Sequence, residues 1–312
     1  MTDDARTPPP DYPTSLLEFQ RRFQTEEACA AYLVKLRWPE GFVCPACEGR
    51  EGWELKSRPF LFECAARGRQ TSVRAGTILH DSRLPLTVWF WAAWLVASHS
   101  NGISAKQLQR QLGLGSYKSA WLLLAKLRRA MVDPERDPLA GLVEADEASM
   151  AHRRKDDPVS GGGGRSTLGR MAIAGAVEIT GGVTGRLRLG PIADYSAKTI
   201  GAFLGAVVAP GALLRTDGWS AYPAVAGYAH EPHVIGPMAA HVVLEAIHQA
   251  FSNLRAWAIG VYHGLRPRHL QSYLDEFVFR FNRRKNRPAG FRSLLRIGTK
   301  TEPVTYRDIV DA

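Results

Sequence analysis

The chain has 312 residues, of which 45% are hydrophobic and 22% charged, a globular composition that is long enough for two or three domains. Its 40 Lys and Arg exceed its 30 Asp and Glu by a formal net charge of +10, which favours a polyanionic partner such as nucleic acid. The chain has only four cysteines, which argues against a secreted fold held together by disulfides. It has no long apolar run, which argues against a membrane-spanning segment.

The N-terminal region is polar and rich in proline up to Pro13, so we expect no signal peptide and a soluble, intracellular protein. An apolar pattern at helical spacing then predicts one helix over residues 15–38. Further along, the acidic, proline-containing segment Asp133–Pro138 reads as a linker. These breaks in the pattern therefore predict three parts, over residues 14–80, 81–135 and 139–300.

Three cysteines in the first part predict a ribbon. Cys44 and Cys47 form a CxxC motif, a predicted hairpin follows, and Cys64 opens a second, similar turn. A zinc ribbon surrounds a tetrahedral ion with four ligands, but Arg67 stands in the fourth position and a guanidinium cannot bind zinc. Cys29 lies on the apolar side of the predicted helix, which indicates a buried core residue. The sequence leaves two states open, a three-cysteine Zn²⁺ site and a degenerate ribbon without metal.

The second part predicts a helix-turn-helix. Residues 104–112 and 116–131 each begin at a serine N-cap, and the turn Gly113-Leu114-Gly115 joins them. In such a motif the second helix enters the major groove of DNA with its N-terminal residues, here Ser116, Tyr117 and Lys118. The alternative is a plain helical hairpin between two domains.

The third part changes to short β patterns followed by helices. Strands are predicted at residues 142–145, 171–179, 186–191 and 213–216, and helices at 197–208, 239–261 and 267–284. This order is that of an RNase H-like fold, whose mixed sheet holds acidic residues at neighbouring strand ends. The predicted fold class is therefore multidomain α+β: a degenerate zinc ribbon, a helix-turn-helix and an RNase H-like catalytic domain.

Two aspartates close predicted strands of this domain. Asp146 follows Ala145, and Asp217 comes just before Gly218. An aspartate before a glycine is by itself ordinary turn chemistry. As a pair, however, they offer the hard oxygen ligands that phosphoryl transfer on DNA needs in order to hold two divalent cations. We therefore predict a site for two Mg²⁺ or Mn²⁺ ions.

A third ligand is expected on the next helix, where Glu245, His248 and Arg255 lie on one face. On ligand type alone, a carboxylate suits magnesium better than an imidazole does, which favours Glu245. The spacing is compatible with either Glu245 or His248.

Several stretches together resemble a known family, and they occur at residues 44–47, 70–80, 143–147, 216–222 and 269–284. The chain resembles bacterial insertion-sequence transposases of the DDE type that carry a zinc ribbon ahead of the catalytic domain. The group is insertion-sequence family fifteen ninety-five, with an ISXO-two-like catalytic domain. The resemblance covers nearly the whole chain.

The resemblance implies a transposase that binds the terminal inverted repeats of its element, hydrolyses strands at the ends and joins the freed 3′-hydroxyl to target DNA. It implies a homodimer or larger assembly on double-stranded DNA, at the nucleoid in the bacterial cytoplasm. The third catalytic position falls on His248, seven residues before Arg255, where the family usually has Lys. His248 thereby becomes the preferred third ligand beside Asp146 and Asp217, as in the DDH subgroup, with Glu245 as the alternative.

Two further basic clusters are predicted DNA contacts, Arg153, Arg154 and Lys155 in a glycine-rich insert, and Arg280, Arg283 and Arg284 at the end of the last predicted helix. For the insert, a solvated charge without a ligand is the alternative. Two rival functions also stay open: a catalytically inactive DNA-binding relic or repressor of the element, and an RNase H-like, structure-directed nuclease.

Overall fold

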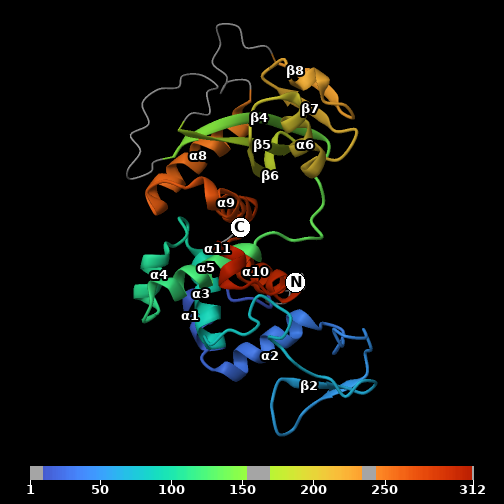
Figure 1. The fold of residues 1–312 in the computed structure, drawn as a ribbon, viewed down its shortest axis with the longest axis vertical. Helices are drawn as coiled ribbons and strands as arrows, with labels where there is room; N and C mark the ends of the chain where they lie inside the picture. The colour runs from blue at the N-terminus through green and yellow to red at the C-terminus, as the bar shows by residue number, and fades with distance from the viewer. Residues whose placement is uncertain (1–9, 153–168, 234–243, 311–312) are drawn as a thin grey trace, which may run out of the picture. The chain divides into compact units, whose positions relative to one another are not determined.

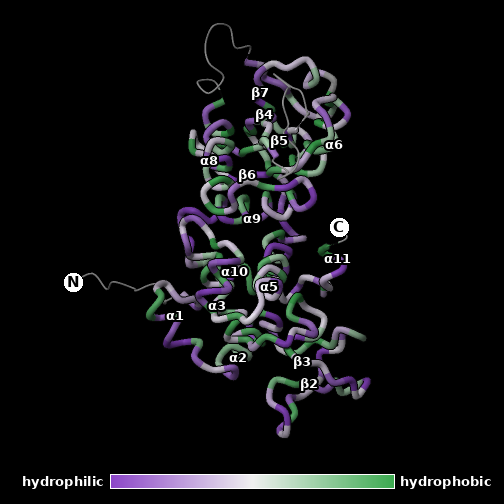
Figure 2. Tube along the Cα trace, turned by 60° about the vertical axis from the view of Figure 1, so that its left-hand side comes forward, coloured by the Kyte–Doolittle hydropathy of each residue, from purple (hydrophilic) through white to green (hydrophobic). Residues whose placement is uncertain are grey.

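The computed structural model describes residues 10–152, 169–233 and 244–310. The chain forms two compact units, one comprising Met1–Met131 with Lys285–Asp311 and the other comprising Val132–Arg284. We call them unit 1 and unit 2. Each contains hydrophobic segments among hydrophilic ones (Figure 2), as two separate cores require. Residues 285–300, which the sequence grouped with the catalytic region, belong to unit 1.

Unit 1 is built from helices and one small sheet. Its elements are α1 (Leu16–Arg22), α2 (Glu26–Arg37), β1 (Gly52–Glu54), β2 (Leu61–Cys64), β3 (Gln70–Ser72), α3 (Leu86–Ser98), α4 (Ala105–Gln111), α5 (Tyr117–Arg129), α10 (Pro288–Lys300) and α11 (Tyr306–Val310). Strands β1, β2 and β3 pair antiparallel in that order, with Trp53 opposite Glu63.

The prediction of a single helix over residues 15–38 is wrong. Helix α1 ends at Arg22 with Phe23 as its C-cap, and α2 begins after Thr25, whose Oγ1 accepts a hydrogen bond from the Ala28 amide at 3.2 Å. A threonine N-cap followed by two glutamates is a strong helix start, because the hydroxyl satisfies an amide that has no partner within the helix. The two predicted helices of the second part are confirmed as α4 and α5, with Ser104 and Ser116 as their N-caps.

An aromatic core explains why α10 belongs to unit 1. Phe291 of α10 is fully buried, and its ring centroid lies 5.5 Å from those of Phe19 and Phe23 and 5.7 Å from that of Phe90. These residues come from α1, the end of α1 and α3. Aromatic pairs in tilted or edge-on contact add about 0.5–1.5 kcal/mol each beyond the burial of their area. The C-terminal helix is therefore part of the N-terminal core.

Unit 2 is a mixed sheet with helices on both faces. Its elements are β4 (Leu142–Ala151), β5 (Arg170–Thr180), β6 (Val183–Ile192), α6 (Ala197–Val207), β7 (Leu213–Thr216), the 3₁₀ helix η1 (Tyr222–Ala224), β8 (Ala229–Pro232), α8 (Glu245–Tyr262), the 3₁₀ helix η2 (Pro267–His269) and α9 (Leu270–Asn282). Within the described residues the strand order is β6-β5-β4-β7-β8. Strands β4, β5 and β6 pair antiparallel, whereas β7 runs parallel to β4 and β8 runs parallel to β7.

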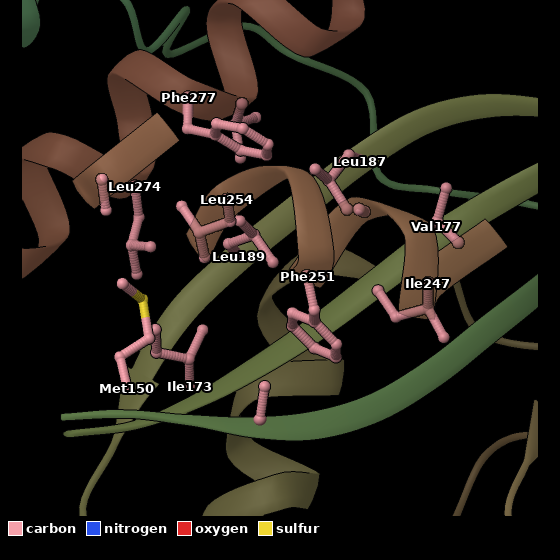
Figure 3. Packing of buried hydrophobic residues seen from close by; sticks show 14 of the residues in the cluster. Met150, Ile173, Val177, Leu187, Leu189, Ile247, Phe251, Leu254, Leu274 and Phe277 are labelled. Atoms are coloured by element: carbon pink, nitrogen blue, oxygen red, sulfur yellow. The ribbon is translucent and has the colours of Figure 1, made fainter. Parts of the chain in front are cut away.

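The alternation of side chains along β4 separates the two faces of this sheet. Ala148 and Met150 belong to a core with α8 and α9, whereas Val143 and Ala145 belong to a core with α6. Helices α8 and α9 therefore cover one face and α6 covers the other (Figure 1). Figure 3 shows the α8 side, where side chains of α8 and α9 pack on strands β4, β5 and β6.

Candidate active site

The two predicted aspartates lie level with each other on neighbouring strands. Val143 pairs with Leu214 and Glu144 with Arg215 in the parallel register of β4 and β7. Two residues further along, Asp146 and Asp217 reach the same level and continue the face that α8 covers. β4 continues to Ala151, so Asp146 lies within the strand instead of at its end as the sequence predicted.

Backbone amides orient both carboxylates. Asp146 Oδ1 accepts a hydrogen bond from the Glu147 amide at 2.8 Å, and its side chain is 8% exposed. Asp217 Oδ1 accepts one from the Trp219 amide at 2.9 Å, and Gly218 between them has a positive φ of 78°. This Asp-Gly turn holds the Asp217 carboxylate just after β7 ends.

Of the two candidates for the third position, the structure brings His248 to Asp146. Nε2 of His248 lies 3.3 Å from Oδ2 of Asp146, and the imidazole is 27% exposed. Glu245 is the first residue of α8 and is exposed to solvent. His248 is one turn further along the helix, over the sheet.

A buried glutamate that the sequence analysis did not single out holds the start of α8. Leu244 is the N-cap of α8 and offers no side-chain acceptor, but Oε2 of Glu144 accepts a hydrogen bond from the Ile247 amide at 3.0 Å. Burial raises the pKa of Glu144, while the amides of Ile247 and Ala246 act in the opposite direction. Glu144 precedes Asp146 by two residues, and this spacing on a strand was the available signal that both face α8.

A glycine allows α8 to approach the sheet at this point. Gly175 of β5 pairs with Asp146, and a Cβ atom there would lie 2.8 Å from both Ile247 Cδ1 and Phe251 Cζ. Figure 3 shows these two α8 side chains directed at the strands. Gly175 thus determines how closely α8 approaches the sheet, and therefore how close His248 lies to Asp146.

A tyrosine contacts the acidic region from the other face of the sheet. Tyr222 is 3% exposed, and its hydroxyl donates to Glu147 Oε1 at 2.6 Å. Burial raises the pKa of Tyr222 well above its usual value, and the charges of Glu147, Asp146 and Asp217 raise it further. The phenol therefore stays protonated and acts as a donor, and both aspartates lie near enough to influence it.

The two candidate metal sites differ in how tightly their ligands gather. Among the described residues, only Cys44, Cys47 and Cys64 form a group of three metal-binding side chains whose ligand atoms all lie within 4.8 Å of one another. At the acidic site, His248 Nε2 lies 3.3 Å from Asp146 Oδ2, and Asp217 follows the neighbouring strand at the same level. Two divalent cations about 3.5–4 Å apart do not require such a tight group, since each ion binds only some of the ligands.

The cysteine cluster fits a tetrahedral ion. Sγ of Cys47 and Sγ of Cys64 are 3.6 Å apart, close to the roughly 3.8 Å between two thiolates that each lie about 2.3 Å from zinc. Cys44 and Cys64 are fully buried. The backbone amide of Ala46 is the largest influence that lowers the pKa of Cys44, to about 7, which favours the thiolate.

Comparison with known protein families finds two matches. Residues 138–282 match the ISXO2-like transposase domain of IS1595 elements, and residues 24–70 match the transposase zinc-ribbon domain. The chain belongs to the IS1595 family of transposases. No curated protein and no solved structure matches it. The family that the sequence motifs indicated is thus confirmed, as is the combination of a zinc ribbon with a transposase domain.

A basic groove lies further along β4 and α8 than Asp146 and His248, in the transposase domain. It has a volume of about 830 Å³ and is lined by three exposed arginines, Arg170, Arg255 and Arg266, together with Ile259 and Tyr262. No Asp or Glu of the described residues lines it. Arg255 is two helical turns beyond His248 on α8. The side chain of Ile259 is 65% exposed, so the groove combines positive charge with apolar surface.

The predicted DNA contacts at the C-terminal end of α9 have partners within the protein. Arg284 donates to the carbonyls of Phe281, Gly185 and Thr184, and Arg283 donates to the Phe279 carbonyl at 3.3 Å. Arg280 is half-buried on the same helix. Both guanidinium groups thus have a structural role, and phosphate contact by Arg280, Arg283 and Arg284 stays a prediction.

The other predicted DNA contacts are either exposed or outside the described residues. Ser116, Tyr117 and Lys118 are exposed at the start of α5, and the Lys118 ammonium lies 3.8 Å from the ring centroid of Tyr306. Arg153, Arg154 and Lys155 lie outside the described residues. In the part of the chain that the structure describes, no helix is both long enough and apolar enough to cross a membrane.

Proposed function

We propose that this transposase cuts DNA at the terminal inverted repeats of its element and joins the freed 3′ ends to target DNA, in a reaction that depends on two Mg²⁺ or Mn²⁺ ions. The observation that carries the proposal is the meeting of Asp146, Asp217 and His248 on one face of the sheet. The strand order, with three antiparallel strands followed by two parallel ones, supports an RNase H-like fold.

The residues of the site support a division of roles. Asp146 is central, since it lies between the β7 strand that leads to Asp217 and the α8 helix that carries His248, so we assign it to both ions. Asp217 and His248 would each complete one ion. When bound, such ions lower the pKa of the attacking water or hydroxyl and stabilise charge on the phosphate.

The protein's own contribution is positioning. Amides hold the two carboxylates, and Glu144 and Gly175 hold α8 at the height that brings His248 to Asp146. No side-chain base is needed in this scheme, because the metal-bound nucleophile is already acidic.

DNA binding follows from the charge distribution. Arg255, with Arg170 and Arg266, lines a groove, and Arg255 lies about 10 Å from His248 along the axis of α8, two turns further on. We assign this groove to the phosphates of the strand being cut. For unit 1 we propose that the ribbon region (residues 14–80) and the α4–α5 helix-turn-helix (within residues 81–135) read the terminal repeat, with Ser116, Tyr117 and Lys118 in the major groove. Cutting of paired ends calls for a dimer or larger assembly.

The test is cleavage of an end-labelled duplex that carries the sequence flanking the reading frame. Wild type should nick at the boundary of the repeat with Mg²⁺ or Mn²⁺, and Asp146→Asn and Asp217→Asn should bind the duplex without nicking it. Asp194→Asn is the matched control, because Asp194 is an exposed aspartate of the same unit that hydrogen bonds to Ser196 ahead of α6. This variant should nick normally.

The rival functions give different results in the same assay. Binding of the repeat by wild type without any nicking would identify a DNA-binding relic or repressor. Nicking of branched or RNA–DNA hybrid substrates with no preference for the repeat would identify a structure-directed nuclease.

A further inference from the structure

The first cysteine turn of the ribbon has a defined set of hydrogen bonds. The Cys44 amide donates to the Gly49 carbonyl at 2.9 Å, and the Glu48 amide donates to the Cys44 carbonyl at 2.8 Å. Glu48 adopts a left-handed conformation with φ of 58°. The turn thereby folds Cys44 and Cys47 back toward one point, and a Cβ atom at Gly49 would lie only 3.3 Å from Cys47 Sγ.

The second turn repeats this pattern residue by residue. The Cys64 amide donates to the Arg69 carbonyl at 3.1 Å, and the Gly68 amide donates to the Cys64 carbonyl at 2.8 Å. Gly68 has a φ of 59°, which matches that of the residue at the same place in the first turn. Cys64 therefore corresponds to Cys44, and Arg67 corresponds to Cys47. The second turn thus has the backbone of a ligand-bearing turn but carries Arg67 where the first turn carries its second cysteine.

The remaining three sulfurs converge, and the fourth side of the cluster is open. The three thiols lie within 4.8 Å of one another, and no fourth His, Cys, Asp or Glu of the described residues joins them. Ala65, Ala66 and Arg67 of the second turn are all exposed. The side from which the fourth ligand would come is therefore accessible to solvent.

We propose that Cys44, Cys47 and Cys64 hold one zinc ion whose fourth coordination position is filled by an exchangeable ligand from solvent. A water molecule, an imidazole or a small thiol has the donor chemistry for that position, since zinc accepts oxygen, nitrogen and sulfur ligands in tetrahedral sites. Structural zinc sites normally close all four positions with protein ligands, so this ribbon would hold its metal less tightly than a four-cysteine ribbon.

The test uses the full-length protein loaded with Co²⁺ in place of Zn²⁺, since Co²⁺ reports its ligands by visible absorption. Wild type should bind one Co²⁺ per chain, and added imidazole should change its spectrum. Arg67→Cys should give the stronger thiolate-to-metal absorption of a fourth sulfur, and imidazole should no longer alter it. Loaded with Zn²⁺, Arg67→Cys should release the metal to a chelator at least about tenfold more slowly than wild type, because a direct ligand matters at least as much as the outer contacts that change affinity 10–100-fold.

Ala66→Cys is the matched control. It adds a thiol to the same exposed turn, but its position corresponds to Ala46, which lies between the two ligands of the first turn. This variant should keep the imidazole response and the zinc release rate of wild type. The proposal is independent of DNA cleavage, which none of these measurements uses.

Three outcomes would overturn the proposal. A wild-type Co²⁺ spectrum that ignores imidazole would mean that the chain supplies its own fourth ligand. Binding of Co²⁺ by Arg67→Cys but not by wild type would mean that the natural ribbon is free of metal. Equal effects of Ala66→Cys and Arg67→Cys would mean that any added thiol suffices, and that the second turn does not define a coordination position.

Discussion

The close packing of α8 on the sheet at Gly175 makes Gly175→Ala the most informative substitution in unit 2. The added methyl carbon would lie 2.8 Å from Ile247 Cδ1 and from Phe251 Cζ, whereas carbon atoms in contact are normally about 3.5–4.0 Å apart. Relief of this overlap requires a shift of roughly 1 Å, and overpacking of this kind costs about 1–3 kcal/mol in unfolding free energy. Because Ile247 precedes His248 directly, the shift moves the imidazole away from Asp146.

The expected result is a loss of both stability and cleavage. Urea unfolding should show the destabilisation, and single-turnover nicking of the labelled duplex should fall about 100-fold, the usual effect of a 1 Å misplacement of a catalytic group. Gly260→Ala on the same helix is the control, because a methyl group there meets nothing within 4 Å. It should stabilise the protein by about 0.5–1 kcal/mol and leave nicking unchanged.

A second variant separates the position of α8 from general damage. Ile247→Val removes Cδ1, one of the three atoms that the methyl group of Gly175→Ala would meet within 3.0 Å, so the double variant should recover part of the lost nicking. If Gly175→Ala unfolds like wild type, α8 does not pack against Gly175 as closely as the structure indicates. If the variant is destabilised by the predicted amount but nicks at the wild-type rate, cleavage does not depend on where His248 lies.

Three further substitutions test the surroundings of the site. Burial raises the pKa of Glu144, so wild type loses stability as pH rises above about 4.5 and the buried carboxyl ionises. Glu144→Gln carries no such group, so its stability relative to wild type should increase from about pH 4 to about pH 8, as urea midpoints measured over that range would show. Tyr222→Phe removes the 2.6 Å hydrogen bond to Glu147 and should cost about 1–3 kcal/mol in unfolding free energy, as measured by urea unfolding. Arg255→Ala should unfold within about 0.5 kcal/mol of wild type but bind DNA with a salt dependence reduced by about one ion, and an unchanged salt slope would remove Arg255 from the DNA interface.

Much of unit 2 could be predicted from the sequence, because its strands carry strong apolar patterns. The strand before Asp217 and its Asp-Gly turn were read from local residues alone. The extent of β4 was not, since the apolar alternation weakens at Glu147 and Ser149 and pairing with β5 continues the strand to Ala151. Strand β8 (Ala229–Pro232) has no strand pattern in the sequence, because it is four residues long, contains His230 and Glu231 and ends at a proline; pairing with β7 holds it in place.

The site shows the same division between local and long-range information. Glu245 and His248 are equivalent by helical spacing, and only the packing of α8 places His248, and not Glu245, beside Asp146. The roles of Glu144 and Gly175 depend on contacts with a helix that lies far away in the sequence. The strand spacing of Glu144 and Asp146 indicates only that both face the same side of the sheet, not which helix they meet. Likewise, the sequence places residues 285–300 in the third part, and only the packing of Phe291 in the core of unit 1 shows that α10 belongs there.

The most direct test of the proposed catalytic site compares the two candidates for its third ligand. Single-turnover nicking of the terminal-repeat duplex in Mg²⁺ should be measured for wild type, His248→Ala and Glu245→Ala, with duplex binding measured in parallel. We predict that wild type and Glu245→Ala nick at the repeat boundary, whereas His248→Ala binds the duplex and leaves it intact. Nicking by His248→Ala at the wild-type rate, or loss of nicking in Glu245→Ala alone, would contradict the assignment of the site to Asp146, Asp217 and His248.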